Sequence, residues 1–258
     1  MSSVASPSVA FRAGAVEVPP WPSEKPRFIL AVVLAIPIWI LLIVSIFGIV
    51  YALLLGLFFL GAKALFIYHV RANGVRVGPE QFPEMHARVT EIARKIGLDP
   101  VPDTYIMQAG GALNALATKF LDSNMMVLYS DLLSACEGNA AARDMIIGHE
   151  LGHIRAGHLE WRWLIAPALI VPFLASALSR AREYTSDRYG MVGAGQRDGA
   201  ELGLIVLAAG GQLAPQVNRK SFVRQRSELG GFWMGLAHLI ATHPPLTKRV
   251  AALADFRV

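Results

Sequence analysis

The chain has 258 residues, of which 54% are hydrophobic and only 17% are charged. This composition is more apolar than a soluble domain of the same length needs, so it indicates a membrane part. The formal net charge is +5, but its lysines and arginines are scattered, which argues against a nucleic-acid partner and favours an anionic membrane surface. The single cysteine, Cys136, excludes an internal disulfide.

The first 70 residues predict a flexible tail followed by a transmembrane hairpin. Residues 1–27 are rich in serine, alanine and proline, so they are expected to be flexible. Residues 28–70 are almost entirely apolar, and as one helix they would be about 64 Å long, roughly twice the hydrocarbon thickness of a bilayer. Two crossings with a turn near residues 45–48 therefore fit best. Basic residues flank both outer ends, which favours a bacterial inner membrane with the domain facing the cytoplasm.

Residues 79–258 have the pattern of a separate domain. Apolar residues at helical spacing predict a helix over 82–96, and strands are predicted over 101–108 and 125–129. The segment 110–118 fits an edge strand or a loop. Residues 213–230 are polar and basic, which fits a mobile loop or lid, or simply a solvated face. Further helices are predicted over 140–158, 200–209 and 246–256, and residues 232–240 form an apolar segment. The predicted fold class is therefore α+β, mainly helical with a small sheet.

The predicted helix over 140–158 contains the motif His149-Glu150-Leu151-Gly152-His153. Two histidines four residues apart differ by about 40° around a helix axis, so both can reach one metal ion. In such H-E-x-x-H motifs the histidines hold zinc and the glutamate takes a proton from the bound water. A catalytic zinc site needs a third protein ligand. His158 would lie about 140° from His153 on a continued helix, so we expect it to be a surface histidine.

Glu183 is the better candidate for the third ligand. Glu183 and Asp187 are four residues apart, so on a helix they share a face. Glu183 would bind the metal, while Asp187 would accept a hydrogen bond from a ligating histidine. The alternative is a surface carboxylate pair that forms ion pairs with neighbouring arginines. Because both halves of one site must lie on the same side of the membrane, the apolar segment 161–178 is expected to be buried, to re-enter the membrane or to lie along it.

These motifs resemble peptidase family M48, which comprises membrane zinc peptidases such as the HtpX-type proteases and the CAAX prenyl proteases. The resemblance covers residues 80–255 and includes Asn114-Ala115 and the segment from Thr242 to Arg249. It implies a zincin-like domain with one zinc ion per chain, held by His149, His153 and Glu183.

The same resemblance implies a role for each remaining motif residue. Glu150 would be the general base, and Asp187 would accept a hydrogen bond from a zinc-binding histidine. Asn114 and Ala115 would hold the backbone of an extended substrate. His243 and Arg249 would stabilise the oxyanion or orient the substrate.

The leading functional hypothesis is a membrane-anchored zinc endopeptidase that cleaves membrane or membrane-associated proteins, with an HtpX-like role in protein quality control. Its partners would be a protein or peptide substrate and the lipid bilayer, and the sequence specifies no oligomeric state. One alternative is a maturation peptidase for a dedicated, lipidated substrate. Another is a zinc-binding membrane scaffold without turnover, although a purely structural site needs a fourth protein ligand rather than a base such as Glu150.

Overall fold

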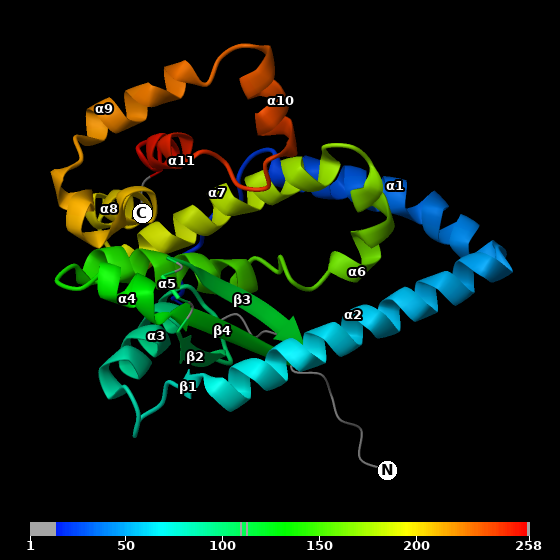
Figure 1. Ribbon diagram of the computed structural model, residues 1–258, viewed down its shortest axis with the longest axis horizontal. Helices are drawn as coiled ribbons and strands as arrows, with labels where there is room; N and C mark the ends of the chain where they lie inside the picture. The colour runs from blue at the N-terminus through cyan, green and yellow to red at the C-terminus, as the bar shows by residue number, and fades with distance from the viewer. Residues whose placement is uncertain (1–13, 109, 112, 257–258) are drawn as a thin grey trace.

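A computed structural model describes residues 14–108, 110–111 and 113–256 (Figure 1). Two long helices, α1 (Glu24–Val44) and α2 (Ile46–Asn73), project from the rest of the chain as an open hairpin (Figure 1). They meet at Ser45, inside the predicted turn, where the Ser45 hydroxyl accepts a hydrogen bond from the Gly48 N–H at 3.2 Å. This bond satisfies one of the free N–H groups at the start of α2.

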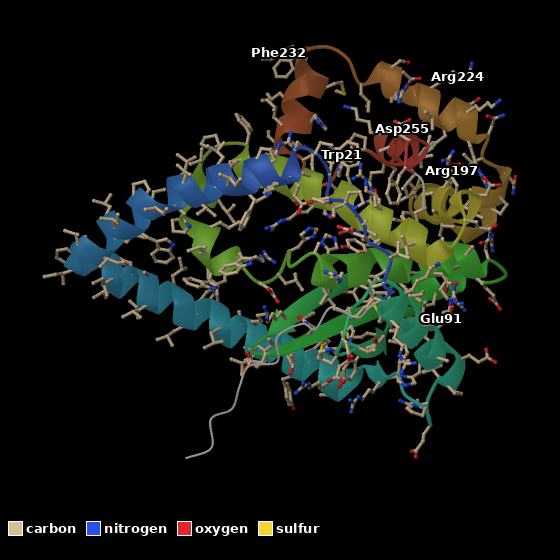
Figure 2. The ribbon with its side chains drawn as sticks, turned by 180° about the vertical axis from the view of Figure 1, so that it is seen from behind. Trp21, Glu91, Arg197, Arg224, Phe232 and Asp255 are labelled. Carbon is tan, nitrogen blue, oxygen red and sulfur yellow. The ribbon has the colours of Figure 1, made fainter. Side chains whose placement is uncertain are left out.

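Both helices of the hairpin expose large apolar side chains along most of their length (Figure 2). Leu41, Phe47 and Phe58 are each more than 60% exposed. Both helices are long and apolar enough to cross a membrane. A continuous apolar surface of this kind is unfavourable in water and favourable in lipid, so it fits the predicted hairpin.

The described part of the predicted tail is packed against the domain. The Val16 N–H donates to the Lys95 carbonyl at 2.9 Å, and the Trp21 ring stacks on Tyr184 with centroids 4.4 Å apart (Trp21 is labelled in Figure 2). α1 then begins at Glu24, before the expected boundary at residue 28. The prediction of a flexible tail therefore does not hold for residues 14–27, because a proline-rich composition disfavours a helix but not a bound extended segment. Residues 1–13 lie outside the described residues.

Four strands form a mixed sheet in the order β1-β2-β4-β3. They are β1 (Val75–Arg76), β2 (Asp103–Met107), β3 (Ala115–Phe120) and β4 (Ser123–Tyr129). β4 pairs parallel with β2 and antiparallel with β3, so β3 is an edge strand. This decides between strand and loop for residues 115–120.

The two faces of the sheet pack against different helices. Along β4, Met126 and Leu128 join the main core with α3 (Pro83–Lys95) and α5 (Ala140–Arg155). The alternate residues Met125 and Val127 pack against the last turns of α2. Because successive side chains of a strand point to opposite faces, one set of β4 residues packs in the main core and the other packs against the end of the hairpin.

The centre of the domain is the pair of helices α5 and α7 (Leu174–Ala194). α5 begins after Asn139, whose side chain caps the helix by accepting a hydrogen bond from the Ala142 N–H at 3.1 Å. α8 (Arg197–Leu213) packs against both helices of this pair, and α11 (Leu246–Leu253) packs against α7 and α8. The short helix α4 (Ser130–Ala135) contacts α8 and β4. The fold is therefore α+β and mainly helical with a small sheet, as predicted.

Glycines allow α5 and α7 to approach closely. A Cβ atom on Gly148 of α5 would lie 2.8 Å from the Tyr189 carbonyl oxygen and 3.0 Å from the Gly190 Cα. A Cβ atom on Gly193 would lie 2.6 Å from the Asp144 carbonyl oxygen. Only glycine fits at such contacts, so this seam fixes the distance between the H-E-x-x-H helix and the helix that carries Glu183.

The segment 161–178 does not form one helix. It folds as α6 (Arg162–Ile165), the 3₁₀ helix η1 (Ala166–Ile170), a turn and the start of α7. Ile165 and Ala168 are buried in a cluster with Ala31 and Ala35 of α1, whereas Ile170 is exposed. The segment therefore lies along the first hairpin helix and does not separate the two halves of the site.

Residues 213–230 are helical, not a loop. They form η2 (Ala214–Gln216), α9 (Arg219–Arg224) and η3 (Gln225–Glu228), and α10 (Phe232–Ile240) follows. The Asn218 side chain caps α9 by accepting from the Ser221 N–H at 3.0 Å. This local cap offsets the polar composition that suggested a loop.

Candidate metal centre

Three side chains from α5 and α7 converge on one point. The Nε2 atoms of His149 and His153 are 3.2 Å apart. Nε2 of His149 lies 3.5 Å from Oε2 of Glu183, and Nε2 of His153 lies 3.5 Å from Oε1 of the same carboxylate. Two tetrahedral zinc ligands at about 2.0–2.1 Å from the ion are about 3.3–3.4 Å from each other. The separation of the two nitrogens is close to one edge of a tetrahedral zinc shell. The two nitrogens and one carboxylate are donors that zinc accepts, and one ligand atom from each of the three residues lies within 4.8 Å of the others.

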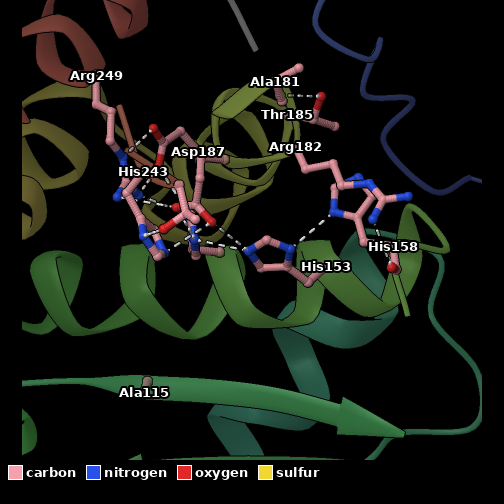
Figure 3. A network of polar contacts seen from close by, with 12 residues as sticks. Ala115, His153, His158, Ala181, Arg182, Thr185, Asp187, His243 and Arg249 are labelled. Carbon is pink, nitrogen blue, oxygen red and sulfur yellow. Dashed lines mark hydrogen bonds and ion pairs between the residues drawn. The ribbon is translucent and has the colours of Figure 1, made fainter. Parts of the chain in front are cut away.

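The Nδ1 atom of His149 faces away from this point and meets Asp187. The two atoms Nδ1 and Oδ1 are 3.0 Å apart. Arg249, from α11, donates to both Asp187 oxygens, at 2.6 and 2.8 Å, and its Nη1 lies 3.3 Å from a Glu183 oxygen. All four side chains are buried, so this network fixes the ring orientation of His149 and the position of Glu183. Asp187 and Arg249 are labelled in Figure 3.

The electrostatics of the network favour a positive charge at the meeting point. Burial alone would lower the pKa of His149, but its hydrogen bonds with Asp187 and Glu183 raise that pKa to about 10. Burial opposes the ionised form of Glu183, yet contacts with His149 and His153 hold the pKa of Glu183 well below its usual value. A doubly charged cation would replace the proton on His149 and balance the buried carboxylates.

A cavity of about 280 Å³ borders the convergence point. Glu150, which follows the first histidine, lines it together with Asn114 and Ala115 from the start of β3. The Asn114 side chain accepts a hydrogen bond from the Ala115 N–H at 2.9 Å, which shapes the entry into β3. The predicted base and the predicted substrate-binding strand therefore face the same space.

His243 and Arg249 also line this cavity, but they differ in exposure. The His243 side chain is 67% exposed, and its Nε2 lies 3.6 Å from Glu183 Oε1. Arg249 is 6% exposed and its donors face Asp187 and Glu183. The exposed imidazole of His243 can therefore contact a ligand in the cavity, whereas the guanidinium of Arg249 is bound to the buried carboxylates of Asp187 and Glu183.

His158 is not the surface residue that we expected. It is buried, its Nδ1 lies 3.0 Å from Nδ1 of His153, and its Nε2 lies 2.9 Å from an oxygen of Glu24 (His153 and His158 are labelled in Figure 3). The expectation failed because α5 ends at Arg155 and Gly157 has a positive φ of 70°. The chain then turns back, so the angle of a continued helix does not apply.

The family comparison covers most of the chain. The model of peptidase family M48 matches residues 79–170 and 161–257, which include both halves of the site. Searches of curated proteins and of solved structures gave no match. The family comprises zinc-dependent metallopeptidases, and the cluster of His149, His153 and Glu183 fits its metal. With the family match over both halves of this site, the chain belongs to peptidase family M48.

Proposed function

We propose that the protein is a membrane-anchored, zinc-dependent endopeptidase with an HtpX-like role in protein quality control. The observation that carries this proposal is the convergence of His149, His153 and Glu183 on one point beside Glu150 at a cavity. In this proposal one zinc ion per chain is held by the two histidines and Glu183. Asp187 orients His149 through the hydrogen bond at 3.0 Å.

The reaction is peptide-bond hydrolysis. When bound, zinc would activate a water molecule and polarise the carbonyl group of the substrate. Glu150 takes the proton of the attacking water and passes it to the leaving amine. Its place in the lining of the cavity supports this role. A structural site would need a fourth protein ligand instead of this base, so the geometry favours turnover over a scaffold.

Substrate would bind as an additional strand on β3. β3 is an outer strand of the sheet, and its first residues line the cavity. An extended peptide can pair with the main chain there, with Asn114 and Ala115 beside the scissile bond. His243 lies within reach of the same space and would stabilise the oxyanion.

Arg249 has a different role in this proposal from the one that the resemblance implied. Its guanidinium donates twice to Asp187 and contacts Glu183, and it is buried. These contacts leave it oriented towards carboxylates rather than towards substrate. We therefore assign Arg249 to the positioning of Asp187 and Glu183.

The hairpin restricts the enzyme to a membrane surface. Both outer ends of α1 and α2 lie on the side of the metallopeptidase domain (Figure 1). Lys25, Arg27 and Arg71 occupy these ends, so the positive-inside tendency favours a cytoplasmic domain at a bacterial inner membrane. Membrane and membrane-associated proteins are then the substrates within reach.

The test compares wild type with Glu150→Gln and with Glu137→Gln as an exposed matched control. We expect all three proteins to bind one zinc ion and only Glu150→Gln to lose proteolysis. Each protein is offered a misfolded membrane protein and a lipidated peptide, with zinc content measured in parallel. Equal cleavage by wild type and Glu150→Gln would refute the mechanism, and cleavage of the lipidated peptide alone would favour a maturation peptidase.

A further inference from the structure

His149 and His153 both turn Nε2 towards the proposed metal, but their Nδ1 atoms meet different partners. Nδ1 of His149 meets the Asp187 carboxylate, whereas Nδ1 of His153 lies 3.0 Å from another histidine, His158. A ligating histidine normally donates its second ring N–H to a carboxylate, a carbonyl group or water. A histidine can replace these acceptors only if its own facing nitrogen carries no proton.

Glu24 supplies the group that fixes this proton arrangement. One of its oxygens lies 2.9 Å from His158 Nε2, so the carboxylate accepts the Nε2–H of His158. In a neutral imidazole the other nitrogen is then an acceptor, and it receives the Nδ1–H of His153. The resulting chain of hydrogen bonds runs from His153 to His158 to Glu24, and it leaves His153 Nε2 with a free lone pair for zinc.

The backbone at the end of α5 places His158 beside His153. The His158 N–H donates to the His153 carbonyl at 3.1 Å, and the Gly157 N–H donates to the Ile154 carbonyl at 3.0 Å. With Gly157 at a φ of 70°, these two bonds form a Schellman motif. In this motif the residue after the glycine contacts the residue five positions earlier. Here that pair is His158 and His153.

Glu24 is itself held on two sides. Its second oxygen accepts a hydrogen bond from the Thr185 hydroxyl, and the Thr185 oxygen accepts from the Trp21 N–H at 2.8 Å. The side chains of His158 and Glu24 are only 3% and 12% exposed, so water competes little for these bonds. Glu24 is the first residue of α1, so the chain of contacts begins where the hairpin leaves the domain.

We propose that His158 and Glu24 are positioning residues for the zinc ligand His153, which couples the seating of the first hairpin helix to the affinity for zinc. This inference rests on the zinc site of the proposed function. The zinc site is then complete only when residues 21–24 are bound against α7. A protein with α1 displaced would therefore hold zinc more weakly.

The test measures zinc affinity by chelator competition in full-length protein in detergent. We expect His158→Phe, which fills a similar volume without an acceptor, to raise the zinc Kd by about 10- to 100-fold. Glu24→Ala should raise it by about tenfold. Glu24→Gln should lie between Glu24→Ala and wild type, because its amide oxygen can still accept. Glu17→Gln, an exposed change in the same N-terminal segment, is the matched control and should leave the Kd unchanged.

A second measurement separates positioning from a general loss of stability. Each variant is loaded with Co²⁺, whose visible absorption reports the geometry of its ligands, and the unfolding temperature of the metal-free protein is recorded. We expect an altered Co²⁺ spectrum in Glu24→Gln and in His158→Phe. Wild-type zinc Kd and Co²⁺ spectrum in folded Glu24→Gln and Glu24→Ala would overturn the inference while leaving the zinc site intact. Absence of zinc binding in wild type would instead refute the proposed function.

Discussion

Gly148→Ala tests whether the glycine seam between α5 and α7 sets the geometry of the metal centre. The added Cβ would lie 2.8 Å from the Tyr189 carbonyl oxygen, 3.0 Å from the Gly190 Cα and 3.2 Å from the Gly193 Cα. These neighbours are backbone atoms, so no rotamer change can relieve the contact. Restoring ordinary contact distances requires the helices to separate by about 0.5 Å. Metal sites tolerate errors of only about 0.2 Å in ligand distance.

We therefore expect Gly148→Ala to affect zinc binding more than folding. Overpacking costs about 1–3 kcal/mol, and the higher helix propensity of alanine offsets up to about 1 kcal/mol of this. Thermal unfolding without metal and chelator competition for zinc measure the two effects. Gly235→Ala in α10, where an added Cβ meets nothing within 4 Å, is the control. It should leave zinc affinity unchanged and should not lower the unfolding temperature, because only the helix propensity of alanine acts there. Unchanged zinc affinity in Gly148→Ala would refute the role of the seam.

Three further predictions follow from the buried groups. Asp187→Asn removes the main charge partner of buried Arg249, so it should lower the free energy of unfolding of the metal-free protein by about 3 kcal/mol, as measured by chemical unfolding. An unchanged free energy of unfolding would contradict this prediction. Without metal, the pKa of His149 is raised from 6.5 to about 10 in the folded protein. Protonated His149 therefore stabilises the folded state fully below about pH 6.5, and this stabilisation is lost as the pH rises towards 10. Zinc needs neutral His149, so the apparent zinc Kd should fall by up to about tenfold per pH unit from pH 7 to 9, and a constant Kd would speak against this proton competition. Burial raises the pKa of Cys136 to about 11, so iodoacetamide should label it more slowly at pH 8 in native than in unfolded protein, as followed by mass spectrometry.

The residues of the metal centre were predictable because their spacing is local. Four-residue spacing on a helix is enough to place His149 beside His153, and Glu183 in line with Asp187. That these two helices meet depends on glycines at 148, 190 and 193, whose pairing across the seam is a long-range contact that a single sequence does not show. The Asn139 cap and the Ser45 turn were likewise predictable from local hydrogen bonding.

The partners of His153 show what sequence reasoning missed and why. A signal for His158 was present, since Gly157 follows the helix at the position of a C-terminal cap and turns the next residue back onto His153. No comparable signal exists for Glu24, because it is 134 residues away from His158 and its segment has the composition of a flexible tail. The extended segment is held by backbone hydrogen bonds and by the stacking of Trp21 on Tyr184, which composition does not reveal.

Anomalous diffraction at the zinc edge, from crystals of the full-length protein grown with zinc, tests the proposed metal centre most directly. We expect one peak per chain, about 2.0–2.2 Å from Nε2 of His149, Nε2 of His153 and a carboxylate oxygen of Glu183. A peak that lies beyond coordination distance of Glu183, or that is bound by other residues, would contradict the metal centre and the mechanism built on it.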